Sequence, residues 1–153
     1  MRTALGRQRN TGWRSHEHEA RILISGVVAP EALAAHQQLL EDVPGAGLLA
    51  VTSPDRLFAN WTATVQARTR GTNPRPAHIE ALLAPLAAQA AIVTVLDAHP
   101  AALSWLGSVA RHRVYPLGVD HFGQCGSLPD LYRAFGIDTA AILDACAAAC
   151  LSR

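Results

Sequence analysis

The run AAIVTVLDA, residues 90–98, limits the possible folds more than any other stretch of this sequence. It is short, continuous and apolar, which is typical of a strand whose two faces are both covered. Stretches with helical spacing separate it from three similar runs: ARILISGVV (20–28), LLAVTS (48–53) and RVYPLGV (113–119). This alternation predicts an α/β fold, a three-layer α/β/α sandwich around a mostly parallel sheet.

Six stretches are expected to form the helices of the outer layers. Leu57, Trp61 and Val65 are four residues apart, which places them one above another on one helical face. Pro85 is expected to interrupt or bend the third helix, because proline lacks the backbone N–H that a helix interior needs. The expected helices are residues 30–43, 54–70, 77–89, 100–110, 127–136 and 138–151.

Length and charge restrict the class of protein. A chain of 153 residues is long enough for one domain with its own core, which we assign to residues 20–153. Residues 1–19 are polar, rich in arginine and without periodicity, so they predict a flexible lead-in. The formal net charge of +1 gives no overall attraction to nucleic acid or to a membrane surface. All 13 basic residues are arginine, which excludes a lysine Schiff base.

The cysteine pattern and the hydropathy pattern bear on location. Cys125, Cys146 and Cys150 form no Cys-x-x-Cys pair, so neither a zinc site nor a redox motif is expected. A reducing, cytoplasmic location is the simplest expectation for three unpaired thiols. No apolar run in the sequence looks long enough to cross a bilayer, so no membrane contact is expected.

The glycine-rich segment GVDHFGQCGSLPDLYRAFGID, residues 118–138, carries the densest group of reactive side chains. One interpretation makes Cys125 a nucleophile, activated by His121 and by the following helix N-terminus. A phosphate cradle is a second interpretation, although Pro129 removes one donor from that helix. We favour a third, in which the glycines permit a tight turn and Ser127 caps the helix. The candidate turn or interface residues are Asp120, His121, Phe122, Gly123, Cys125 and Gly126.

A second candidate site lies at the end of the run AAIVTVLDA. Asp97 and His99 should stand at the carboxyl edge of the sheet, where open α/β sheets bind their ligands. A competing interpretation is that the aspartate caps the next helix. The sequence assigns no catalytic, cofactor-binding or metal-ligating residue.

The segment 118–138 also resembles one region of a known family. In the C-terminal domain of transketolase and of the thiamine-diphosphate-dependent 2-oxoacid (pyruvate) dehydrogenases, a segment Gly-(Ile/Val/Thr)-Asp-x-Phe-Gly-x-Ser-Gly precedes a helix and then Phe-Gly. Cys125 replaces the usual serine here. The matching residues are Gly118, Asp120, Phe122, Gly123, Gly126, Leu131, Tyr132, Phe135, Gly136 and Ile137.

Three earlier blocks resemble the preceding strand–helix units of that domain, in the same order along the chain. The variants DHFGQ and TSPDRL are closer to the pyruvate dehydrogenase-like members than to transketolase proper. The resemblance therefore implies a sheet of about five strands, one of them an antiparallel edge strand. The three blocks are ISGVVAPEALAAHQQL, LLAVTSPDRLFANW and IVTVLDAHPAALSWLGSV.

The resemblance implies a function for the chain only together with other domains. In the family, thiamine diphosphate and magnesium lie between two further domains, one of which carries a Gly-Asp-Gly motif that this sequence lacks. The C-terminal domain organises the enzyme and extends its dimer contact. We therefore expect an oxidoreductase or transketolase part that binds no cofactor alone and associates with the other domains or subunit. The alternatives are a stand-alone binding or thiol-reactive module and a non-functional gene fragment.

Overall fold

The computed structural model describes residues 20–151, and in them a parallel sheet of four strands in the order β2-β1-β3-β4. The central strand β1 pairs with β2 on one side and with β3 on the other, so that Ile22 stands opposite both Leu48 and Val93. The strands are β1 (Ala20–Ser25), β2 (Gly47–Ala50), β3 (Ala91–Leu96) and β4 (Val114–Leu117). All four are strands that the sequence predicts, and every residue of β3 is buried, as a strand covered on both faces should be.

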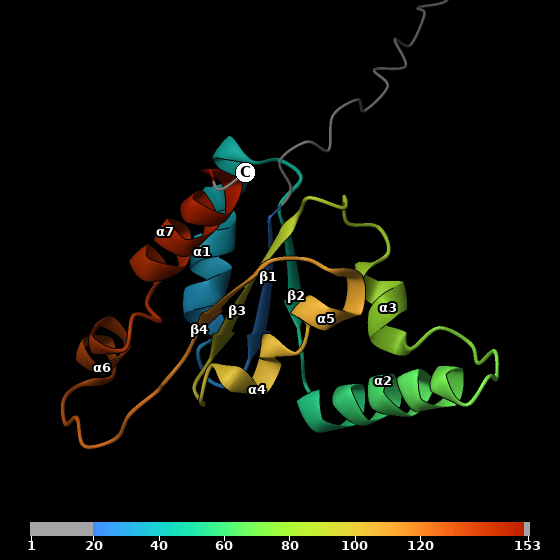
Figure 1. Ribbon diagram of the computed structural model, residues 1–153. Coiled ribbons are helices and arrows are strands. Elements are labelled where there is room, and N and C mark those ends of the chain that lie inside the picture. Colours follow the sequence, from blue (N-terminus) through green and yellow to red (C-terminus); the bar gives the residue numbers. More distant parts are fainter. Residues whose placement is uncertain (1–19, 152–153) are drawn as a thin grey trace, which may run out of the picture.

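Helices cover both faces of the sheet, which confirms the three-layer α/β/α architecture (Figure 1). One layer contains α1 (Ala29–Asp42), α6 (Leu128–Ala134) and α7 (Thr139–Leu151). The other contains α2 (Pro54–Thr69), α3 (His78–Leu83), α4 (Ala101–Ser104) and α5 (Gly107–Ala110). Each layer closes its own apolar cluster, one around Ile22, Val93 and Ile142, the other around Leu23, Ile92 and Leu103.

The strand count differs from the expectation of about five strands with an antiparallel edge. Residues 20–151 form four strands, and all of their pairings are parallel. The predicted lead-in, residues 1–19, lies outside the described residues. β4 is an edge strand of this sheet and contains Pro116. Proline is tolerated there because the outer side of an edge strand needs no backbone N–H donor.

Two helices are shorter than the sequence predicts. α3 ends at Leu83, before Pro85, so the expected interruption is confirmed. Residues 100–110, expected to form one helix, are divided into α4 and α5. Between α4 and α5 the backbone hydrogen bonds join residues three apart, as in a 3₁₀ turn, instead of four apart as in an α-helix. One of them runs from the Leu106 N–H to the Leu103 carbonyl. Gly107, a weak helix former, lies at this break.

The C-terminal region contains a stretch, Leu128–Leu151, that by length and composition alone could cross a membrane, contrary to the sequence expectation. The structure divides this stretch into α6 and α7 at Gly136, whose φ of 62° ends the first helix. α7 then buries Ile142, Cys146 and Ala149 against the sheet and α1. The other residues of the stretch, apart from Ile137, are half-buried or exposed.

Half-buried hydrogen bonds between Glu31 and Thr139 join the N-termini of α1 and α7. The Glu31 carboxylate accepts hydrogen bonds from the Thr139 backbone N–H at 2.9 Å and from the Thr139 hydroxyl. Asp138 caps the same helix by accepting from the Ala141 N–H at 3.1 Å. The two carboxylates satisfy donors at the positive end of α7 and fix it beside α1.

Candidate functional site: the carboxyl edge of the sheet

The carboxyl ends of β1 and β3 meet where the strand order changes direction, which is the usual ligand-binding position of a parallel sheet. Asp97 follows β3 here and lies directly over Gly26, which follows β1. A Cβ atom on Gly26 would come within 1.9 Å of Asp97 Oδ1, and Gly26 has a φ of 88°. The glycine is therefore required both by its backbone conformation and by the position of the carboxylate.

The Asp97 side chain bonds the start of a helix, but not the helix that the sequence suggested. Its Oδ2 accepts from the Val27 backbone N–H at 3.4 Å, immediately before α1, whereas the next helix in the chain is α4. The carboxylate thus joins the ends of β3 and β1 across the sheet. It also places a negative charge near the positive end of α1.

The two candidate groups named from the sequence lie together at this edge. The Val119 N–H donates to the Ala98 carbonyl at 3.0 Å, which holds the segment after β4 against the segment after β3. Hydrogen bonding to His121 is the main cause that lowers the pKa of the Asp120 carboxyl, and the charge of His99 lowers it further. His99 itself accepts from the Ala101 N–H through Nδ1 at 3.2 Å.

The loop from Asp120 to Ser127 is exposed along its whole length. Gly123 adopts a φ of 106° with open space around it, so its backbone conformation and not a close contact favours glycine. Ser127 is the N-cap residue of α6, as predicted, but its hydroxyl donates to Asp130 Oδ2 at 2.6 Å and makes no capping bond to the backbone. The segment from Asp120 to Ser127 is therefore an exposed loop without a hydrogen-bonded turn, and Ser127 is an N-cap residue without a capping bond.

The arrangement of His121 differs from the thiol–imidazole pair required by the interpretation that makes Cys125 a nucleophile. Its Nδ1 is hydrogen-bonded to Asp120, and its ring packs against Phe135 with a centroid separation of 5.1 Å. Within residues 20–151 no hydrogen bond joins His121 to Cys125, which is an exposed free thiol. The described residues also contain no group of three or more His, Cys, Asp or Glu side chains able to hold a metal ion.

Exposed apolar side chains flank these polar groups. Phe122 is 97% exposed in the loop, and Val27 and Leu128 are 65% and 63% exposed at the starts of α1 and α6. Val27 follows the carboxyl end of β1, and Phe122 and Leu128 lie in the segment that follows the carboxyl end of β4. Of the three, only Phe122 is a candidate from the sequence, since a sequence pattern does not show which apolar side chains at the start of a helix face solvent. We call Val27, Phe122 and Leu128 the carboxyl-edge apolar residues.

The three thiols should differ strongly in reactivity. Burial, with some contribution from Cys150, raises the pKa of Cys146 from the ordinary 9.0 to about 12, and burial raises the pKa of Cys150 as well. Both therefore remain protonated at neutral pH, and protonated thiols are poor nucleophiles. A colorimetric disulfide reagent at pH 8 should titrate one thiol, Cys125, quickly and all three only in denaturant. Two or more fast thiols in the native protein would contradict this packing.

The raised Cys146 pKa also sets a direction for alkaline stability. The folded state favours the neutral thiol, so this contribution is complete below pH 9 and is lost as the pH rises towards about 12. Unfolding by urea should therefore need less denaturant at pH 10.5 than at pH 8, because over this range the Cys146 thiol of the unfolded chain, with its ordinary pKa of 9.0, loses its proton while the folded thiol keeps it. Cys146→Ala should reduce this loss, and an unchanged pH dependence in that variant would contradict the assignment.

The fold and its edge define a three-layer α/β domain of the transketolase-like fold. Among solved structures, the chain is similar to one described as a split-gene transketolase, inactive beta4 tetramer, with a TM-score of 0.58 and 18% identity. The match covers 86% of this chain but 39% of that chain, so the present chain spans well under half of its neighbour. No family model and no curated protein matches the sequence. At this identity the likeness establishes the fold.

Proposed function

We propose that the chain is the C-terminal organisational and dimer-contact domain of a cytoplasmic thiamine-diphosphate-dependent enzyme, resembling transketolase or the decarboxylating component of pyruvate dehydrogenase. The fold likeness to the split-gene transketolase chain carries this proposal. The pattern Gly118, Asp120, Phe122 supports it from the sequence, because these residues lie in the strand-to-helix connection that the family pattern describes. The domain acts with other domains or with a partner subunit.

The exposed carboxyl edge supports a docking role. Phe122 is 97% exposed in the loop after β4, and Val27 and Leu128 are exposed in the segments that follow β1 and β4, so this edge offers apolar side chains to a partner. Aromatic side chains that become buried at an interface commonly carry much of its binding free energy. The proposal therefore places the contact with the rest of the enzyme at the carboxyl-edge apolar residues.

The described residues do not fit thiamine diphosphate or magnesium. No Gly-Asp-Gly sequence occurs in the chain, and no cluster of metal-ligating side chains occurs between residues 20 and 151. The two carboxylates at the sheet edge already have partners: Asp97 accepts from the Val27 N–H, and Asp120 is hydrogen-bonded to His121. They do not belong to a cluster of metal-ligating side chains. The other domains would therefore hold the cofactor.

Isothermal titration calorimetry of the purified chain tests whether it binds the cofactor by itself. Titration with thiamine diphosphate in the presence of magnesium should produce no saturable heat, because the cofactor-binding domains are absent from the chain. The positive control is a complete transketolase under the same conditions. Saturable binding with a micromolar dissociation constant would contradict the proposal and would make the chain a cofactor-binding module.

A further inference from the structure

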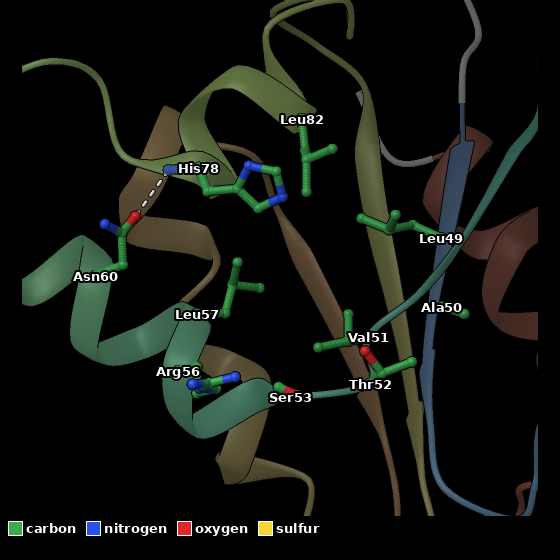
Figure 2. Close-up of a pocket in the computed structure, with 10 residues that line it drawn as sticks. All are labelled: Leu49, Ala50, Val51, Thr52, Ser53, Arg56, Leu57, Asn60, His78 and Leu82. Carbon is green, nitrogen blue, oxygen red and sulfur yellow. Dashed lines mark hydrogen bonds between the residues drawn. The ribbon is translucent and has the colours of Figure 1, made fainter.

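A cavity of about 240 Å³ opens between β2, α2 and α3, on the face of the sheet opposite α1 and α7 (Figure 2). It exists because α2 does not close over the sheet: of its 16 residues only Thr64 is fully buried. Instead an aromatic stack holds α2 against the α4–α5 region, with Trp61 and Trp105 ring centroids 5.2 Å apart. The space left beside β2 is smaller than the roughly 300–1,000 Å³ of drug-sized ligand pockets, which suits a smaller molecule.

The floor of the cavity is apolar. Leu49 and Val51, from β2 and the segment after it, face Leu57 of α2 and Leu82 of α3 across the open space. These four side chains belong to or pack against the apolar cluster on this face, so the floor continues the core. The apolar part of a ligand bound here would pack against a preformed surface.

The rim supplies hydrogen-bond donors that the described chain does not use. The Arg56 guanidinium has no ion pair or hydrogen-bond partner within residues 20–151, and the same holds for the His78 imidazole. The Asn60 Oδ1 accepts from the His78 backbone N–H at 2.8 Å and so joins α2 to the start of α3, while the Asn60 amide nitrogen points away from the cavity (Figure 2). Figure 2 shows the His78 ring directed into the space beside Leu57 and Leu82.

The charge of the lining favours an anion. No aspartate or glutamate lines the cavity. The nearby Glu80 is bonded to Arg68 at 2.8 Å and to the Ala77 N–H, and the Arg68 hydrogen bond holds the pKa of Glu80 below its ordinary value. Its negative charge is thus compensated away from the cavity. A guanidinium beside an apolar floor is a suitable partner for a carboxylate that carries an aliphatic chain.

We propose that this cavity binds a small aliphatic monocarboxylate, with the carboxylate on Arg56 at the rim and the aliphatic chain on the apolar floor. This site is separate from the carboxyl-edge apolar residues and goes beyond the proposed docking role. It gives the domain a ligand of its own, whatever the chain associates with.

Ligand-observed NMR with hexanoate tests the proposal on the purified chain. Hexanoate should give a saturable signal, whereas hexanamide, which has the same length and no charge, should bind at least about tenfold more weakly. Arg56→Gln should weaken hexanoate binding by about tenfold or more, because it removes a charge-assisted bond. Since Arg56 is exposed, this variant should keep the native fold, which a thermal melt verifies.

Arg75→Gln is the matched control, because Arg75 is an exposed arginine outside the cavity lining. It changes the net charge equally and should bind hexanoate as the unaltered chain does. Any one of three results would overturn the proposal: no saturable hexanoate signal, equal binding of hexanoate and hexanamide, or an Arg56→Gln variant that binds as tightly as the Arg75→Gln variant.

Discussion

Replacing Gly118 by alanine is expected to lower the free energy of unfolding by about 2 to 3 kcal/mol, as overpacking at a rigid contact does. An added Cβ would lie 2.5 Å from the Ala98 carbonyl oxygen and 2.9 Å from the Pro100 nitrogen, and both of these are backbone atoms. Neither can rotate away, so the strand ends of β3 and β4 would have to separate. The separation would also break the hydrogen bond from the Val119 N–H to Ala98.

Gly126→Ala is the control for this change. It lies in the same segment, but its Cβ would make ordinary contacts of 3.5 Å or more with Asp130 and Leu131. Urea unfolding followed by circular dichroism should show a much lower midpoint for Gly118→Ala and a nearly unchanged one for Gly126→Ala. Equal midpoints would mean that Gly118 does not hold the two segments together.

Replacing Phe122 by aspartate is expected to weaken docking to the rest of the enzyme by about 30-fold or more, the size of effect found at aromatic interface anchors. The side chain is almost fully exposed in the isolated domain, so its removal costs no core packing and the thermal stability should stay unchanged. The change should be made in the natural gene. Association is then measured as thiamine diphosphate recovered per mole of antigen with an antibody to this domain.

Leu151→Asp is the matched control for the docking surface. Leu151 is also exposed, at 82%, but it ends α7 at the opposite end of the molecule from the loop that carries Phe122 (Figure 1). This variant should retain the cofactor-containing complex. If Phe122→Asp retained as much thiamine diphosphate as Leu151→Asp, the carboxyl edge would not be the docking surface.

The layered fold could be predicted from the sequence because its main signals are local. Residues 91–96 of the apolar run 90–98 formed a fully buried strand, and the helix that begins at His78 ended before Pro85, as expected. The division of residues 100–110 was missed, since periodicity alone does not separate a continuous helix from two short turns around Gly107.

The candidate sites depended on contacts between distant segments. The sequence named Asp97 and Asp120 separately, but only the parallel order of β1, β3 and β4 brings their segments to one edge. The bond from the Val27 N–H to Asp97 joins residues 70 apart in the chain, beyond any local pattern. The cavity beside Arg56 and His78 could not be predicted either, because it forms where α2 does not pack closely on the sheet, and that depends on tertiary packing.

Immunoprecipitation from a native extract of the natural source, with an antibody to residues 20–151, tests the central claim most directly. The precipitate should contain thiamine diphosphate, held either by a longer chain that includes this domain or by a partner subunit, and immunoblotting then gives the size of the antigen. A precipitate that contains the antigen but no thiamine diphosphate above the control antibody would contradict the assignment of this chain to a thiamine-dependent enzyme.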